Sequence, residues 1–161
     1  MAQDRFPLRI NAGFLINAPI STSREINFDL SSISLGSDLN LKTLVGKVEL
    51  TRTPKGILVE AGFSATMQAE CVRCLDEFDQ LLRTDFSELY AFHANSVTDS
   101  GLIVPEDGNI DLLPLLREYL LIEVPIKTVC REDCQGLCII CGENLNHQTC
   151  EHQAEKNRSD F

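Results

Sequence analysis

The chain has 161 residues, 43% of them hydrophobic, with a formal net charge of −10 at pH 7. This length fits one domain with its own core, and the acidic charge argues against extensive direct binding to RNA, which needs clustered Lys and Arg. No apolar run approaches the roughly 20 residues that span a bilayer. The polar start at Met1 lacks the pattern of an export signal, so we expect a cytoplasmic protein with no membrane segment.

The first half of the chain has the patterns of β-strands. Two less regular strands are predicted around residues 8–14 and 25–30, and a third over residues 47–52. The turn residues Thr-Pro-Lys-Gly at 53–56 separate this strand from the next. From Ile57 to Cys71 the odd positions are apolar and the even positions mostly polar, which predicts a long strand with one buried face.

A further strand and one helix follow. After a corner at Cys71-Val-Arg-Cys74, apolar residues from Phe78 to Tyr90 indicate another strand, and residues 91–109 read as a surface loop. A helix is predicted over about 111–122, capped by Asp111 and ended by Pro125. Its apolar positions follow helical spacing, which provides a face to pack on the sheet: Leu112, Leu116, Tyr119 and Leu120.

These patterns predict an α+β fold. We expect a mainly antiparallel β-sheet or partly closed barrel with one covering helix, followed by a C-terminal cysteine-rich zinc-knuckle segment. The predicted boundary divides a β-rich domain, residues 1–128, from a cysteine-rich metal-binding segment and polar tail, residues 129–161.

The cysteines are the most specific feature of the sequence. Seven cysteines and one nearby histidine form four close pairs: Cys71/Cys74, Cys130/Cys134, Cys138/Cys141 and Cys150/His152. In a reducing cytoplasm, such pairs favour metal binding over disulfides. Zn²⁺ takes four Cys or His ligands, so eight ligands would fill two sites, and one or two zinc ions are expected. Iron in a Cys₄ site uses the same ligands and stays an alternative.

Two pairings of these ligands are open. In the one we favour, Cys138/Cys141 close a site with Cys150/His152, and Cys130/Cys134 meet Cys71/Cys74. In the other, the four cysteines from 130 to 141 surround one ion and leave Cys71/Cys74 without metal. His152 is the least certain ligand, since His147 or Glu151 could replace it, and His93 is predicted to be a surface residue.

Three stretches of this sequence resemble the bacterial YceD family, the large ribosomal RNA subunit accumulation proteins. They are Glu70-Cys-Val-Arg-Cys74, the leucine-rich residues 110–118, and the run from Cys130 to Asn146. The resemblance implies a role in the accumulation or processing of 23S ribosomal RNA, with ribosome-biogenesis proteins or the pre-50S particle as partners. Family members commonly end the cysteine motif in Cys-x-Cys, whereas this chain has Cys150-Glu-His152.

The sequence also bears on other classes of function. No Gly-rich phosphate loop, catalytic triad order or His-Glu-x-x-His helix occurs, so we expect a non-enzymatic protein without catalytic residues. The alternative is a cytoplasmic thiol oxidoreductase or metal-handling protein, which would need an accessible Cys-x-x-Cys pair of low pKa. A third possibility is a zinc ribbon that binds nucleic acid through a local basic patch. Only a few basic residues lie near the cysteines to form one: Arg73, Lys127, Arg131, Lys156 and Arg158.

Overall fold

The computed structural model describes residues 7–152, and the chain divides into two compact units. The first unit comprises Met1–Thr66 and Leu81–Val124, and the second comprises Met67–Gln80 and Pro125–Phe161. Residues 67–80 group with the later segment because they carry Cys71 and Cys74, which lie beside cysteines of that segment. The sequence boundary between residues 128 and 129 stays a prediction. Lys156 and Arg158 lie outside the described residues.

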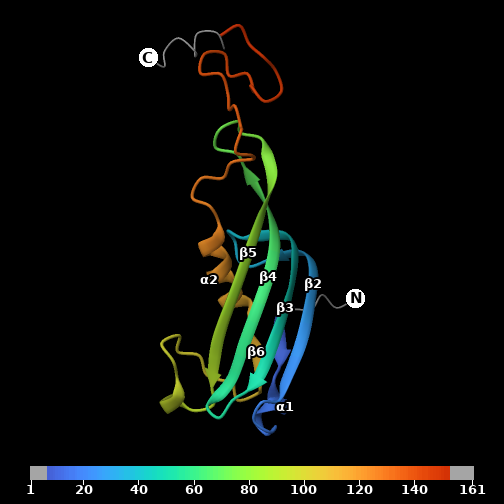
Figure 1. The fold of residues 1–161 in the computed structure, drawn as a ribbon, viewed down its shortest axis with the longest axis vertical. Coiled ribbons are helices and arrows are strands. Elements are labelled where there is room, and N and C mark those ends of the chain that lie inside the picture. Colours follow the sequence, from blue (N-terminus) through green and yellow to red (C-terminus); the bar gives the residue numbers. More distant parts are fainter. Residues whose placement is uncertain (1–6, 153–161) are drawn as a thin grey trace. The chain divides into compact units, whose positions relative to one another are not determined.

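The main sheet has four strands in chain order (Figure 1). They are β2 (Ser23–Ser34), β3 (Asn40–Arg52), β4 (Gly56–Glu70) and β5 (Glu77–Ala91). β2 and β3 are antiparallel, with Leu30 opposite Leu44. The sheet is open, so the predicted alternative of a partly closed barrel is wrong. The edge strands β2 and β5 stand at opposite ends of the strand order and do not pair with each other within residues 7–152.

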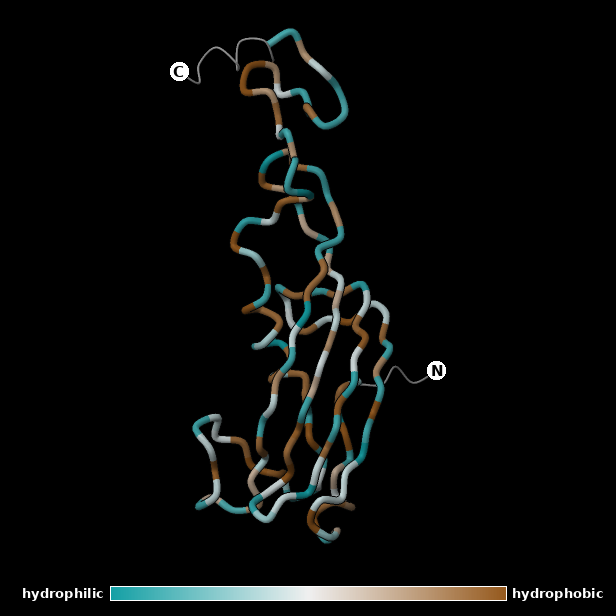
Figure 2. The backbone as a smooth tube through the Cα atoms, viewed as in Figure 1, coloured by the Kyte–Doolittle hydropathy of each residue, from teal (hydrophilic) through white to brown (hydrophobic). Residues whose placement is uncertain are grey.

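The alternation predicted for β4 is confirmed. Ile57, Val59, Phe63 and Ala65 are buried, whereas Glu60 between them is exposed. In Figure 2, hydrophobic and hydrophilic stretches follow one another along the strands of the sheet. One face of the strand therefore packs on the core and the other meets solvent.

The turn between β3 and β4 also lies where the sequence places it. The backbone N–H of Thr53 donates to the Gly56 carbonyl at 2.8 Å, and the Gly56 N–H donates to Thr53 Oγ1 at 3.1 Å. Glycine is required here because a Cβ at residue 56 would lie 2.1 Å from the Tyr90 carbonyl oxygen. The turn can therefore pass directly against the end of β5.

The N-terminal region differs from the prediction. A strand was expected over residues 8–14, but β1 (Arg9–Asn11) is short and pairs antiparallel with β6 (Asn109–Asp111). The one-turn helix α1 (Gly13–Ile16) follows. The strand stops because Asn11 Oδ1 accepts a hydrogen bond from the Gly13 N–H at 2.9 Å, which turns the chain. The predicted loop before β6 contains a short 3-10 helix, η1 (Ala94–Ser96).

The long helix α2 (Leu113–Glu123) covers one face of the sheet (Figure 1). The helix begins two residues later than predicted, and its N-cap residue is Leu112. Asp111, one residue before the N-cap, accepts a hydrogen bond at Oδ1 from the Leu113 N–H at 3.0 Å. Its residues Leu116 and Leu120 are fully buried, and Tyr119 stacks on Phe86 of β5 with ring centroids 4.6 Å apart. No helix among residues 7–152 is long and apolar enough to cross a membrane.

Candidate metal centres

The turn between β4 and β5 carries the first pair of cysteines. The Cys71 N–H donates to the Asp76 carbonyl and the Leu75 N–H donates to the Cys71 carbonyl, each at 2.9 Å. Leu75 has a φ of 63°, in the left-handed region that tight turns use. This tight turn brings the Cys71 and Cys74 thiols into one group.

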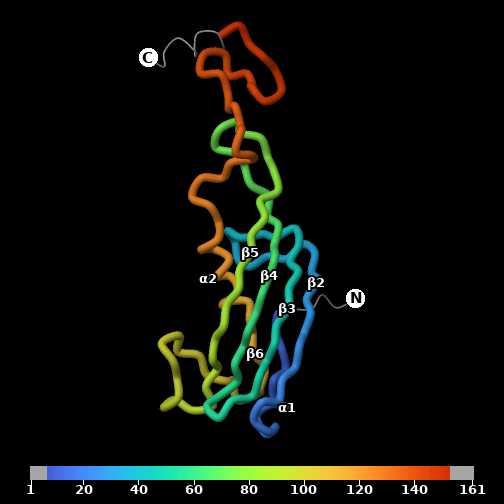
Figure 3. Tube along the Cα trace, viewed as in Figure 1, coloured from blue at the N-terminus to red at the C-terminus, as the bar shows by residue number. Residues whose placement is uncertain are grey.

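The segment from residue 125 lies beside this turn, as the chain trace in Figure 3 shows. The Val72 N–H donates to the Thr128 carbonyl at 2.9 Å, and the Thr128 hydroxyl donates to the Glu70 carbonyl at 2.6 Å. These two bonds fix the position of the chain just before Cys130. Cys130 and Cys134 therefore lie next to the thiols of the turn.

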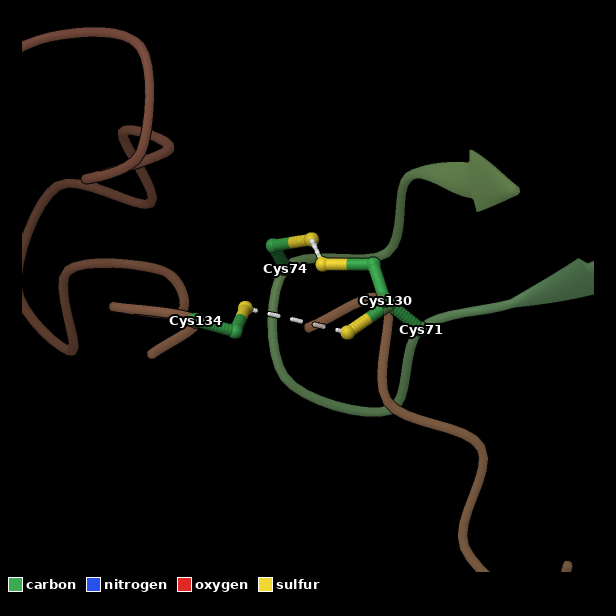
Figure 4. A group of neighbouring side chains, drawn as sticks. All are labelled: Cys71, Cys74, Cys130 and Cys134. Carbon is green, nitrogen blue, oxygen red and sulfur yellow. Dashed lines mark hydrogen bonds between the residues drawn. The ribbon is translucent and has the colours of Figure 1, made fainter. Parts of the chain in front are cut away.

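The four sulfurs form one group (Figure 4). The Sγ atoms of Cys71 and Cys134 are 3.8 Å apart, and those of Cys74 and Cys130 are 3.7 Å apart. All four lie within 4.8 Å of one another. A tetrahedral zinc with Zn–S bonds of about 2.3 Å has sulfurs about 3.8 Å apart. The group therefore fits a metal ion of this size, and it is shielded by Phe78 and Val129.

The pKa values of these thiols also fit a metal site. Burial raises the pKa of Cys71, but hydrogen bonds from backbone amides, first that of Cys130, outweigh it and lower the pKa to about 6. Burial and the thiols around Cys130 raise the pKa of that residue to about 12. Four thiolates at these distances repel one another, so all four can ionise at neutral pH only with a cation among them.

The second group consists of Cys138, Cys141, Cys150 and His152, whose ligand atoms also lie within 4.8 Å of one another. The backbone turn has the same hydrogen bond as the turn of the first group. The Gly142 N–H donates to the Cys138 carbonyl at 2.9 Å, and Gly142 has a φ of 78°. Hydrogen bonds from the amides of residues 141 and 140 lower the pKa of Cys138 to about 6. Burial raises the pKa of Cys150.

His152 has the environment of a ligand. Its Nδ1 atom is buried and has no hydrogen-bond partner among the residues that the structure describes. A buried ring nitrogen without a partner is costly unless a ligand or ion satisfies it. His147 and Glu151 are not part of the group, and His147 Nε2 instead lies 2.8 Å from Asp76 Oδ2. His93 is exposed, as predicted.

Asparagine residues that the sequence analysis did not single out support the first group. Asn146 Nδ2 donates to Cys134 Sγ at 3.3 Å, and Asn146 Oδ1 accepts from the Gln135 N–H at 2.8 Å. Asn144 Nδ2 donates to Asp76 Oδ2 at 2.9 Å, which ties the tail to the turn after Cys74. The only signal in the sequence was the pattern Asn144-Leu-Asn146, which begins two residues after Gly142.

The structure thus brings the eight candidate ligands together in two groups of four. Cys71/Cys74 lie with Cys130/Cys134, and Cys138/Cys141 lie with Cys150/His152. The competing arrangement, with the four cysteines from 130 to 141 in one group, is not found in residues 7–152. Both groups lie in the second unit.

Comparison with known proteins gives a family. The family model described as "Large ribosomal RNA subunit accumulation protein YceD" matches residues 59–161, more than half of the chain. This range covers most of β4, all of β5 and α2, and both groups of candidate ligands. No solved structure matches the chain significantly.

Individual relatives agree with this match. The uncharacterized protein ML1660 of Mycobacterium leprae is 31% identical over 88% of this chain and 66% of its own length. Rv2926c of Mycobacterium tuberculosis is 31% identical over 88% of this chain and 68% of its length. The chain thus spans about two thirds of these relatives. The chloroplastic "Large ribosomal RNA subunit accumulation protein YCED homolog 1" of Arabidopsis thaliana is 36% identical over 29% of this chain and 15% of its own.

Proposed function

This chain belongs to the YceD family, and we propose from that membership that it supports the accumulation of large-subunit ribosomal RNA. The observation that carries the proposal is the match of the family model over residues 59–161. The Arabidopsis relative bears the same description in its name. The proposed role is that of a non-enzymatic cytoplasmic factor that supports the accumulation or processing of 23S ribosomal RNA and the assembly of the large subunit.

We further propose that each group of four candidate ligands binds a zinc ion. The sulfur spacing of the first group and the unpaired Nδ1 atom of His152 in the second support this assignment. Four protein ligands fill a tetrahedral site without leaving a position for water or substrate, which is typical of structural zinc. The ions would then hold the second unit together and take no part in catalysis. Metal analysis of the purified protein distinguishes zinc from iron.

The proposed partners are proteins of ribosome assembly or the pre-50S particle. The net charge of −10 disfavours broad contact with the RNA backbone. Metal loading makes the chain more acidic, because seven ligand thiolates contribute −7 and two Zn²⁺ ions return +4, a further change of −3. Binding through a basic protein surface is therefore favoured over direct coating of RNA.

The proposed function is tested by deleting the gene and measuring the ratio of 23S to 16S ribosomal RNA in growing cells. The ratio should fall, and the intact chain should restore it. A chain with Cys71→Ser and Cys74→Ser should fail to restore it, whereas Val72→Ser, between the two cysteines and half exposed, should succeed. An unchanged ratio in the deletion strain would rule out the role.

The alternative of a thiol oxidoreductase has one observation in its favour. Cys138 has a pKa of about 6, and its partner Cys141 in the Cys-x-x-Cys pair is exposed. A protein that works this way would purify without metal and reduce a disulfide substrate. A metal-loaded protein inert toward disulfides would exclude this alternative.

A further inference from the structure

A groove with a volume of about 580 Å³ lies in the first unit and is lined by residues of α2, β5 and β6 and of the loop before β6. Its lining is largely apolar, including Leu102, Leu115 and Ile122. Ile122 is 77% exposed, so the apolar surface continues from the groove onto the helix. An apolar groove of this size resembles the pockets that bind drug-sized ligands, about 300–1,000 Å³.

The charged residues of the groove all have the same sign. They are Glu88 on β5, Asp111 at the end of β6 and Glu118 on α2. Among the described residues, no Lys or Arg lines the groove. The Tyr119 hydroxyl donates to Glu88 Oε1 at 2.6 Å, which leaves the other oxygen of that carboxylate to accept from elsewhere. The groove therefore favours a ligand that carries a positive charge.

The second observation is the Tyr90 side chain, which lines the groove. It is only 6% exposed and lies close to the carboxylates of Glu88 and Asp111. Burial, followed by the charges of Glu88 and Asp111, raises the pKa of Tyr90 to about 12, so the hydroxyl stays neutral. The oxygen of this neutral hydroxyl can accept a hydrogen bond from a donor in the groove.

We propose that this groove binds an arginine side chain presented by a segment of a protein partner. A guanidinium has five donors in a planar fork, which suits several carboxylates and a phenolic oxygen around one site. Its aliphatic stem can lie on Leu115 and Leu102. The groove is larger than one guanidinium, so the neighbouring residues of the partner have room beside it. The inference rests on the groove alone, so it does not depend on the proposed role in ribosomal RNA accumulation.

The test is an NMR titration of the full-length protein with two short peptides. One has a single arginine between leucines, and the other has citrulline, the neutral isostere of arginine, at the same position. The arginine peptide should bind with a Kd at least tenfold lower and should shift the signals of Tyr90 and Tyr119. Added salt should weaken its binding, as expected for an electrostatic contact.

Three variants locate the binding. Glu118→Gln and Tyr90→Phe should each raise the Kd about fivefold or more, because each removes one group that contacts the guanidinium. Glu123→Gln is the matched control: it makes the same change five residues further along α2, outside the groove, and should leave the Kd unchanged. Circular dichroism of each variant checks that the fold is kept, and Glu118 is exposed, so its substitution does not disturb the core.

Specific outcomes would overturn the proposal. Equal binding of the arginine and citrulline peptides would show that charge is not recognised. Equal effects of Glu118→Gln and Glu123→Gln would show that the contact lies elsewhere. Displacement of the arginine peptide by spermidine at the same concentration would identify a site for small polyamines in place of a protein segment.

Discussion

Asn146 is the side chain that joins the first cysteine group to the loop after it. It donates to Cys134 Sγ and accepts from the Gln135 N–H and from Arg131 Nη2. A hydrogen bond to a ligating thiolate stabilises its negative charge, and this bond lowers the pKa of Cys134. If the first group holds a metal ion, this residue would support the ligand Cys134 without being a ligand itself.

We predict that Asn146→Ala weakens metal binding at the first group by about 10- to 100-fold, the usual cost of losing a residue that orients a ligand. Competition with a chromophoric chelator measures this affinity. Asn95→Ala, in the exposed helix η1, is the control and should leave the affinity unchanged. An Asn146→Ala protein that retains metal as tightly as the unaltered chain would show that the bond to Cys134 has no such role.

The two tyrosines of the chain give a prediction about pH. Burial raises the pKa of Tyr90 to about 12 from an ordinary value of 10.0, and the hydrogen bond to Glu88 raises that of Tyr119. A raised pKa in the folded state stabilises the fold fully below about pH 10, and this contribution is lost as the pH rises towards 12. The near-ultraviolet absorbance of the native protein should therefore show little tyrosinate at pH 10.

Unfolding in urea at pH 10 should make that tyrosinate absorbance appear. Glu88→Gln removes a carboxylate that acts on both rings, so it should shift the native titration of both tyrosines to lower pH. Identical titration curves for native and unfolded protein would contradict the environment described for these side chains.

At the scale of elements, local patterns in the sequence were enough to predict the long strands and the long helix. The alternation from Ile57 to Cys71 predicted β4, and the helical spacing from Leu112 to Leu120 predicted α2. The pairing of β1 with β6 was missed because it joins residues about a hundred positions apart, and three-residue strands carry no periodic signal. The stop after Asn11 depends on one side-chain hydrogen bond, which composition does not reveal.

The same reasoning applies to the candidate metal centres. Pair spacing singled out the eight candidate ligands but left two groupings open, and the structure brings the residues together in the grouping that was favoured. Asn146 and Asp76 were not predicted, because their partners Cys134 and His147 become neighbours only after the tail has folded beside the turn. Residues that support a ligand from far away in sequence have no local pattern.

The elements of the two units should respond differently to loss of metal. The segment from Pro125 onward, within residues 125–152, has no helix or strand of its own, so metal binding would supply much of its folding free energy. Chelation should remove amide-exchange protection from residues 129–152, while the central strands β3 and β4 stay protected. Unchanged protection of the tail after complete metal removal would refute this dependence.

At the scale of the whole molecule, the family match spans the described part of the second unit and continues into the first. The second unit joins the β4–β5 turn to a segment that begins fifty residues later, and the four cysteines of the first group come equally from these two pieces. A metal ion among them would act as a cross-link across a long loop. Such a link stabilises the fold by restricting the unfolded chain, by up to several kcal/mol in chain-entropy models.

The most direct test of the two metal centres is to count the bound ions by native mass spectrometry. The unaltered chain should carry two zinc ions, and the variant with both Cys71→Ser and Cys74→Ser should carry one. The melting temperature of this variant should also fall, because the cross-link is lost, whereas Val72→Ser should keep two ions and the original melting temperature. If the double variant retains its full metal content, Cys71 and Cys74 do not bind metal and the cross-linking site does not exist.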